Sequence, residues 1–296
     1  MNPPPLSWRA ALLHGSLRLA GHIPLRLLHA CGALLGHVSW LLDGRLRKTV
    51  ERNLSLAVTQ QSAETRHALA RQALVETGKA AFEVARIWGR GARRCLPLVR
   101  EVRGEALLDE ALARGKGVIV AAPHLGCWEL LGYWLASRTP LAVLYRPPRQ
   151  AWLEPLLVRV RGDLAAEQVR AEASGVRTLL RRLAGGGAIG ILPDQKPRRG
   201  EGIDAPFFGV PASTMVLLPR LAQRTGATVL FAFAERLPRG AGYRVHILPA
   251  PDEIASQDTA RACAALNRGV EACVRMAMPQ YQWSYRRWPR DARPPA

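Results

Sequence analysis

The sequence is poor in cysteine, in lysine and in acidic residues. Its 296 residues include five cysteines and 23 aspartates and glutamates, and only four of its 42 basic residues are lysine. The cysteines form no C-x-x-C pair. An odd number of cysteines without that spacing argues against a disulfide framework or a zinc knuckle and favours a reducing compartment. We therefore expect no metal site built on cysteine.

Motifs of nucleic-acid-binding proteins are missing as well. The formal charge of +19 implies an acidic partner: a nucleic acid, an anionic membrane surface, an acidic protein or a phosphorylated substrate. The arginines are scattered, and we find no zinc-finger spacing, basic-zipper region or RNA-recognition signature. Charge alone does not choose among these partners. With 48% hydrophobic residues, the chain can bury a sizeable core in one large domain or two small ones.

The sequence also lacks an uncharged stretch that, as a helix, matches the full thickness of the hydrocarbon core of a bilayer. Residues 27–42 carry no formal charge, but as a helix they reach roughly 24 Å, short of the ~30 Å hydrocarbon core of a bilayer. Arginines interrupt the preceding apolar segment and no small-residue cleavage site follows, which argues against a signal peptide. Basic residues flank the stretch. We predict that residues 1–44 form a membrane anchor, spanning the bilayer or lying in its interface on anionic lipid; a buried core helix is the alternative.

The rest of the chain, residues 45–296, alternates between strand and helix patterns without an internal repeat or a long linker. Short apolar runs predict strands at residues 117–122, 141–145, 187–192, 227–234 and 243–248. Helical periodicity predicts helices at residues 63–90, 105–114, 127–137, 152–161, 175–184, 212–224 and 259–276. This alternation predicts an α/β domain with a central, mostly parallel sheet flanked by helices.

The segment "HLGCWE", residues 124–129, carries the clearest chemical signal. His124 follows the predicted strand 117–122 almost at once, at the sheet edge where open α/β sheets bind their ligands. Glu129 falls in the first turn of the next helix, from where it can reach back to the imidazole. A carboxylate on one imidazole nitrogen fixes the tautomer and makes the other nitrogen a better base, here for a hydroxyl nucleophile. The alternative is a histidine that merely satisfies a loop. A zinc site is not favoured, because the spacing differs from that of two ligands on one helix.

Several further segments, together with this one, resemble the bacterial late acyltransferases of lipid A biosynthesis, the lauroyl and myristoyl transferases related to the glycerolipid acyltransferases. The segments occur in that family's order: residues 23–57, "HLGCWE" (124–129), "LYRPPR" (144–149), "ILPDQ" (191–195), "APFFGVPAST" (205–214) and "PQYQWSYRRW" (279–288). One departure is Cys127, where the family often has a polar residue. Cysteine at this place is more often a small buried residue than a nucleophile.

The resemblance implies a function and a location. An acyl group would pass from acyl carrier protein, or from coenzyme A, to a hydroxyl of a Kdo-linked lipid A precursor, with His124 as base and Glu129 as its partner. Arg161 matches an arginine that binds a substrate phosphate in relatives. The enzyme would act on the cytoplasmic face of the inner membrane of a Gram-negative bacterium, with no metal or redox cofactor. Its partners would be acyl carrier protein, the lipid A precursor and anionic membrane lipids, and not nucleic acid.

Other residues at the same predicted edge are weaker candidates for substrate binding. Asp194 and Gln195 follow the strand 187–192, although they are equally typical of a capping pair in a turn. Arg146, Arg149 and Lys196 also follow predicted strand ends and can form a basic rim, or simply be solvated surface charges.

Three rival functions remain open from the sequence. One is acylation of another glycolipid, such as a phosphatidylinositol mannoside. The second is a peripheral nucleic-acid-binding protein, which only the charge supports. The third is a hydrolase that uses the His124–Glu129 pair on water.

Overall fold

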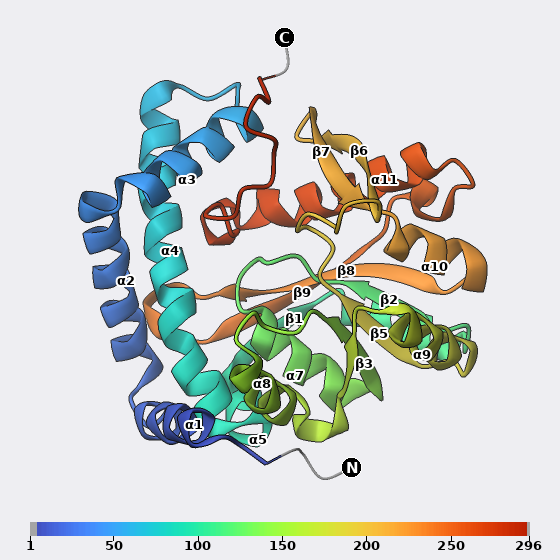
Figure 1. Cartoon of the computed structure of the whole chain (residues 1–296), viewed down its shortest axis with the longest axis horizontal. Helices are drawn as coiled ribbons and strands as arrows, with labels where there is room; N and C mark the ends of the chain where they lie inside the picture. Colours follow the sequence, from blue (N-terminus) through green and yellow to red (C-terminus); the bar gives the residue numbers. More distant parts are fainter. Residues whose placement is uncertain (1–4, 295–296) are drawn as a thin grey trace.

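The computed structural model describes residues 5–294, and its centre is a seven-stranded sheet (Figure 1). The strands lie in the order β1-β9-β8-β2-β5-β3-β4. β8 and β9 pair antiparallel, and the other neighbouring strands pair parallel. In that order their bounds are Val99–Arg103, Tyr243–Pro249, Thr228–Arg236, Val118–Ala121, Ala188–Ile191, Leu141–Tyr145 and Glu167–Arg170. The predicted α/β fold with a mostly parallel sheet is confirmed.

Helices cover both faces of the sheet, as Figure 1 shows for α7 on one side and α10 and α11 on the other. The side chains of β2 alternate between two cores, with Val118 and Val120 in one and Ile119 and Ala121 in the other. This double burial explains why the central strands read as continuous apolar runs. The helices are α1 (Trp8–Ala20), α2 (Leu25–Leu42), α3 (Gly44–Ala57), α4 (Ala63–Arg90), α5 (Ala92–Cys95), α6 (Glu105–Ala113), α7 (Trp128–Arg138), α8 (Glu154–Arg161), α9 (Ala173–Ala184), α10 (Leu217–Thr225) and α11 (Thr259–Met276).

The sequence patterns do not predict the two strands at the edges of the sheet. All five predicted strands form, with ends within two residues of the expected ones. The additional strands β1 and β4 have the sequences VREVR and EQVR. Because an edge strand is only partly covered, its charged residues interrupt the apolar run that marks a central strand.

A hairpin of β6 (Gly202–Phe207) and β7 (Val210–Met215) stands apart from the main sheet. The two turn residues, Phe208 and Gly209, have φ angles of 50° and 76°, as a tight hairpin turn requires. The predicted helix 212–224 is therefore wrong at its start, and α10 begins only at Leu217. The apolar spacing of residues 212–216 fits both a strand and a helix, and only the pairing with β6 decides between them.

The N-terminal helices pack on the rest of the protein rather than standing free. α2 crosses α4 where Gly32 and Gly36 face Gly78, so closely that a Cβ on Gly32 would lie 2.6 Å from the Gly78 carbonyl oxygen. Within the described residues, α2 is the one helix long and apolar enough to cross a membrane, by length and composition. The division into an anchor (1–44) and an acyltransferase domain (45–296) stays a prediction, whose residues 1–4 and 295–296 lie outside the described part.

Candidate active site

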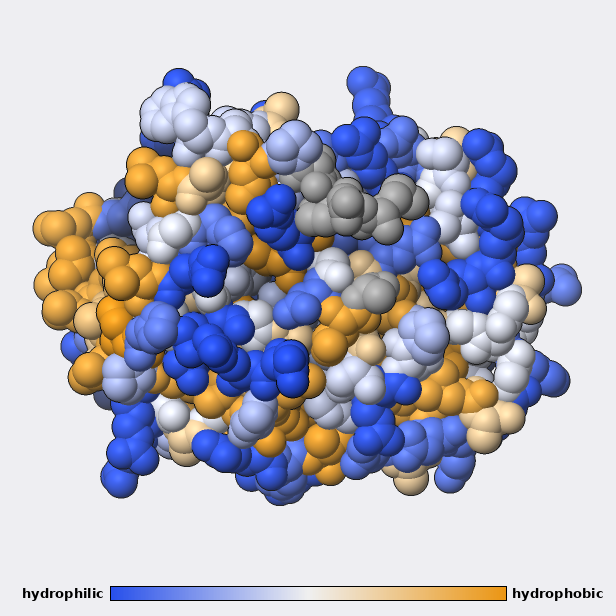
Figure 2. Space-filling model, turned by 90° about the horizontal axis from the view of Figure 1, so that it is seen from below, coloured by the Kyte–Doolittle hydropathy of each residue, from blue (hydrophilic) through white to orange (hydrophobic). Residues whose placement is uncertain are grey.

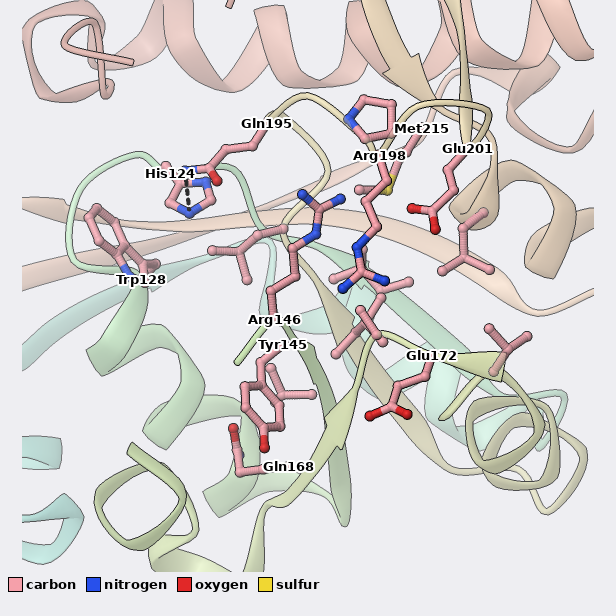
Figure 3. Close-up of a pocket in the computed structure, with 18 of the residues that line it drawn as sticks. His124, Trp128, Tyr145, Arg146, Gln168, Glu172, Gln195, Arg198, Glu201 and Met215 are labelled. Carbon is pink, nitrogen blue, oxygen red and sulfur yellow. Dashed lines mark hydrogen bonds between the residues drawn. The ribbon is translucent and has the colours of Figure 1, made fainter. Parts of the chain in front are cut away.

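A cavity of about 740 Å³ opens at the carboxyl ends of β2, β3 and β5 (Figure 3). That size is typical of a small-molecule site, and its position agrees with the ligand-binding edge of an open α/β sheet. One part of its wall is apolar and comprises Val143, Leu144, Val176, Ile191, Met215 and Leu217. The other part is polar and includes His124, Arg146, Arg161, Gln195 and Arg198. The cavity can therefore hold a long apolar chain and a charged group together.

The turn that carries His124 is fixed by neighbouring backbone. The backbone N–H of Gln282 donates to the carbonyl oxygen of His124 at 3.0 Å, and Cys127 donates to Ala234 in β8 at 2.8 Å. Between them, Gly126 has a φ angle of 61°, and a Cβ there would lie 2.0 Å from the carbonyl oxygen of Ala234. Only glycine fits this position. The histidine thus sits on a rigid turn at the mouth of the cavity.

The partner of His124 is Asp194. Its Oδ1 lies 2.8 Å from the imidazole Nδ1, and its Oδ2 accepts the backbone N–H of His124 at 2.9 Å. The sheet register explains the contact, because Ala121 pairs with Ile191 and both functional residues follow three positions later on adjacent parallel strands. Burial opposes ionisation of Asp194, but the charge of His124 and these hydrogen bonds outweigh it and hold the pKa of the carboxyl below its usual range.

An ionised Asp194 settles the tautomer of the imidazole. Nδ1 carries the proton and donates to the carboxylate, which leaves the lone pair of Nε2 directed to the cavity side. The imidazole itself is 15% exposed. Asp194 binds it on the buried side, and the cavity side of the ring remains accessible. This is the arrangement of a general base.

The expected contact between Glu129 and His124 is wrong. Glu129, in the first turn of α7, makes a two-pronged pair with Arg161 of α8: Nε to Oε2 at 3.0 Å and Nη2 to Oε1 at 2.5 Å. The indole N–H groups of Trp88 and Trp128 also donate to it. Burial raises the pKa of Glu129. The charge of Arg161 and the hydrogen bonds from Arg161 and the two indoles lower it by a larger amount, so the pKa lies below its usual value. A guanidinium attracts this carboxylate more strongly than an imidazole that another carboxylate already holds.

The structure brings some of the other predicted residues to the cavity. Arg161 lines it while paired with Glu129, and Arg146 lines it while donating to the backbone oxygen of Lys196 at 3.2 Å. Gln195 lies over the imidazole, with its Nε2 3.2 Å from Nε2 of His124. Asp194 is buried behind the histidine, so its side chain holds the imidazole rather than forming the wall.

Two predicted residues do not face the cavity. The ammonium group of Lys196 donates to the carbonyl oxygen of Trp288 at 3.3 Å and so points to the C-terminal segment. Burial and the nearby arginines lower its pKa. Arg149 is exposed and is not part of the cavity wall.

A buried ionic cluster beneath the turn was missed by the sequence reasoning. Arg236 of β8 binds both carboxylate oxygens of Glu83 in α4, at 2.8 and 2.6 Å, and also donates to the carbonyl oxygen of Gly126 at 2.7 Å. The hydroxyl of Tyr243 donates to Glu83 at 2.8 Å. The one available signal was a glutamate on the apolar side of the helix 63–90.

The same cluster affects the nearby thiol. Burial, together with the negative charge of Glu83, raises the pKa of Cys127 well above its usual value. A thiolate nucleophile is therefore not favoured at this position. Among residues 5–294, no three histidine, cysteine or acidic side chains converge to hold a metal ion.

Comparisons with known proteins identify the family of this chain. Residues 5–290 match the bacterial lipid A biosynthesis acyltransferase family. The chain is 26% identical to the lipid A biosynthesis lauroyltransferase of Escherichia coli (strain K12), over 96% of this chain and 92% of the relative. It is 27% identical to the lipid A biosynthesis palmitoleoyltransferase of the same organism, with the same coverage. It is also 31% identical to a phosphatidylinositol mannoside acyltransferase of Mycobacterium tuberculosis (strain CDC 1551 / Oshkosh), but over only 57% of this chain.

The family match covers almost the whole described chain, and it includes the histidine turn, the cavity and the C-terminal segment that holds the turn. The chain therefore belongs to the bacterial lipid A biosynthesis acyltransferase family and is an acyltransferase of lipid A biosynthesis.

Proposed function

We propose that this enzyme moves a fatty acyl chain from the thioester of acyl carrier protein to a hydroxyl of a Kdo-linked lipid A precursor; acyl-coenzyme A is the alternative donor. The observation that supports this best is the His124–Asp194 pair at the end of a largely apolar cavity. The base can take the proton of a hydroxyl nucleophile, and the apolar wall can bind a fatty chain.

The reaction needs one base and no covalent enzyme intermediate. Nε2 of His124 takes the proton of the acceptor hydroxyl while its oxygen attacks the thioester carbonyl carbon. Asp194 stabilises the imidazolium that forms. The tetrahedral intermediate then breaks its carbon–sulfur bond, and the leaving thiolate takes the proton from Nε2. The products are an ester and a free thiol.

Glu129 and Arg161 serve this reaction through the shape and charge of the cavity. Glu129 holds the guanidinium of Arg161 in a two-pronged pair and also binds Trp128, whose ring lies 5.3 Å from that of His124. Arg161 is 28% exposed toward the cavity. Its fork, fixed on one side by the carboxylate, binds an anionic group of the substrate on the other. We therefore keep Glu129 as a residue of the site, acting through Arg161 and Trp128.

Positive charge around the opening favours an acidic donor protein. Arg146 and Arg198 project into the cavity (Figure 3). Neither forms an ion pair with a carboxylate anywhere in the described residues, and the chain carries a formal charge of +19. Such a surface attracts acyl carrier protein and phosphorylated lipid by long-range electrostatics.

The N-terminal helices provide the contact with the cytoplasmic face of the inner membrane. Figure 2 shows apolar side chains gathered along the edge of the molecule that α1 and α2 form. Only a third of α2 is buried in the protein, and its close crossing with α4 keeps it against the catalytic domain. We propose that α1 and α2 lie in the membrane interface, so that the acceptor reaches the cavity without leaving the lipid phase.

The similarity to a phosphatidylinositol mannoside acyltransferase gives a second candidate acceptor. The longer coverage by the lipid A relatives favours the lipid A precursor. Mass spectrometry of lipid A from cells that lack this protein, and from cells that express it again, tests the choice. We expect one acyl chain to be missing in the first and restored in the second. If lipid A is unchanged while the acylated mannosides are altered, the acceptor is the phosphatidylinositol mannoside and the proposal is wrong.

A further inference from the structure

The carboxamide of Gln195 occupies the place where the acceptor hydroxyl must bind. Its Nε2 lies 3.2 Å from Nε2 of His124, as the dashed line in Figure 3 marks, and 3.1 Å from Oε1 of Gln282. A hydroxyl that gives its proton to the base needs a similar distance along the same lone pair. Gln195 must therefore leave this position when the acceptor binds.

The direction of these hydrogen bonds follows from Asp194. Since the proton of the imidazole lies on Nδ1, Nε2 can only accept. The group that faces it must be a donor, which is the NH₂ end of the carboxamide. The oxygen of Gln282 then accepts the second N–H of the same group. Turning the Gln195 amide around would set two acceptors against each other at both contacts, so the orientation is determined by the network.

Gln282 keeps the displaced amide close to the reacting atoms. The backbone N–H of Gln282 donates to the carbonyl oxygen of His124 at 3.0 Å, so the tether is fixed to the catalytic turn itself. When the acceptor oxygen replaces Gln195 at the base, one N–H stays on Gln282 and the other becomes free. The thioester carbonyl carbon bonds to that acceptor oxygen, so its own oxygen comes within a few ångströms of the freed N–H.

We propose that Gln195 is the oxyanion donor of this enzyme: its amide caps the base at rest and donates to the thioester carbonyl oxygen during attack. This inference rests on the proposed role of His124. As the hydroxyl oxygen adds to the carbonyl carbon, the carbonyl double bond opens onto its oxygen, and the N–H of Gln195 stabilises that negative charge. When the carbon–sulfur bond breaks, the carbonyl forms again and the amide is released to return to Nε2.

The test compares Gln195→Ala, Gln195→Glu and the matched control Gln257→Ala, which replaces an exposed glutamine in the loop before α11. Turnover is measured with acyl carrier protein thioester and lipid acceptor, and folding by circular dichroism. Loss of one oxyanion donor typically lowers kcat by about 10²- to 10³-fold. We expect that loss in Gln195→Ala, with a nearly unchanged KM for the donor, and full activity in Gln257→Ala.

Gln195→Glu separates an oxyanion donor from a residue that only supports the fold. Glutamate has the same shape, but its carboxylate offers no N–H to the oxyanion and favours the protonated imidazole. We expect kcat to fall at least as far as in Gln195→Ala and the rise of rate with pH to shift to higher pH. Because Gln282 acts through Gln195, the double variant with Gln282→Ala should be no slower than Gln195→Ala alone.

A Gln195→Ala protein that keeps or raises kcat would show that the amide only caps the base, and would overturn the inference. The His124→Ala variant in the same assay separates this outcome from failure of the proposed function. If His124→Ala is inactive while Gln195→Ala is active, only the oxyanion role falls. If His124→Ala is active, the assignment of the base falls as well.

Discussion

Among single residues, Asp194 has the strongest influence on the chemistry of the site. It is 3% exposed and accepts two hydrogen bonds from His124, one from the ring and one from the backbone. The first fixes the tautomer of the imidazole, and the second fixes the turn that carries it. A single carboxylate therefore sets both the orientation of the proposed base and its place in the cavity.

We expect Asp194→Asn and His124→Ala to lower turnover by similar factors. A positioned general base contributes about 10²- to 10⁴-fold, and a neutral amide at position 194 stabilises neither the correct tautomer nor the imidazolium. Since the two residues act as one unit, the double variant should be hardly slower than His124→Ala. Initial rates of the three folded proteins give the answer, and near-normal turnover in Asp194→Asn would contradict the role of the carboxylate.

Variants of Arg161 test the proposed anion site in the cavity. Loss of a hydrogen bond to a charged group costs about 1.5–3 kcal/mol, so Arg161→Ala should raise the KM for the lipid acceptor by roughly 10- to 100-fold. Arg161→Lys should recover only part, because an ammonium cannot replace the two-pronged fork on Glu129.

The matched control removes the carboxylate as well. The variant Glu129→Gln/Arg161→Ala relieves the buried charge that Arg161→Ala leaves unpaired, so it should unfold at a higher temperature than Arg161→Ala. An unchanged acceptor dependence in Arg161→Ala would remove Arg161 from the substrate site and leave it as a structural partner of Glu129.

At the scale of helices and strands, the Glu83–Arg236 pair joins α4 to β8 and to the histidine turn. It also reaches α2, where His29 lies 3.4 Å from Glu83. Both members of the pair are almost fully buried. Burial alone would raise the pKa of Glu83, but the charge of Arg236 and the hydrogen bonds of His29 and Arg236 lower it from 4.5 to about 2.

This shift predicts how stability depends on pH. The folded protein binds fewer protons at Glu83 than the unfolded chain, so the contribution of the carboxylate is complete above pH 4.5 and is lost as the pH falls toward 2. Glu83→Gln should lower the free energy of unfolding at neutral pH by about 3–5 kcal/mol, because Arg236 stays buried without its partner. The variant should then lose less stability than the wild type between these two pH values.

Thermal unfolding followed by circular dichroism measures both effects. The control is Glu110→Gln, which removes an exposed ion pair on α6 whose atoms are 4.0 Å apart. Such a pair contributes about 0–1 kcal/mol, so this variant should follow the wild type. A Glu83→Gln protein with wild-type stability at neutral pH would contradict the supporting role of the cluster.

Considered as a whole, the molecule carries the face that we propose lies on the membrane on helices that are distinct from the strands around the cavity. The exposed large apolar residues lie mainly on or next to α1 and α2, and include Trp8, Leu12, Leu19, Leu27, Leu34, Leu41 and Leu42. α2 packs directly on α4, where Gly36 lies against the backbone of Leu74 and Gly32 against that of Gly78. Removal of residues 1–44 would expose that face, so membrane binding is better tested in the full chain.

The test replaces two exposed leucines of α2 by glutamine. Leu34 and Leu41 are 65% and 74% exposed, so Leu34→Gln/Leu41→Gln removes apolar surface without opening the core. Burying a leucine side chain contributes about 1.5–3 kcal/mol, and we expect binding to anionic vesicles to weaken at least tenfold. Flotation with vesicles measures it. The control is Met276→Gln, which replaces an exposed apolar residue at the end of α11 and should bind vesicles normally. Full vesicle binding by the double variant would contradict the assignment of this face.

The central architecture could be read from the sequence because it depends on local patterns. Strands buried on both faces leave continuous apolar runs, and helices leave a period of 3.6 residues. His124 was identifiable for the same reason, since it directly follows such a run. Asp194 and Gln195 also follow a predicted strand, and the carboxyl ends of parallel strands share one edge of the sheet, so they could be placed at the same edge. Edge strands and the β6–β7 hairpin could not be read in this way. Charged residues interrupt the apolar runs of the edge strands, and the apolar spacing of β7 fits a helix as well as a strand.

The pairing of the charged side chains was decided by the tertiary structure alone. Glu129 stands five residues from His124, yet it binds Arg161, and His124 binds an aspartate 70 residues away. Separation along the chain does not fix which carboxylate meets which cation; the register of β2 with β5 and the packing of α7 on α8 do. The sequence by itself determined that a histidine stands at the ligand-binding edge of the sheet. Folding determined its partner, because buried charges pair with the nearest opposite charge in space.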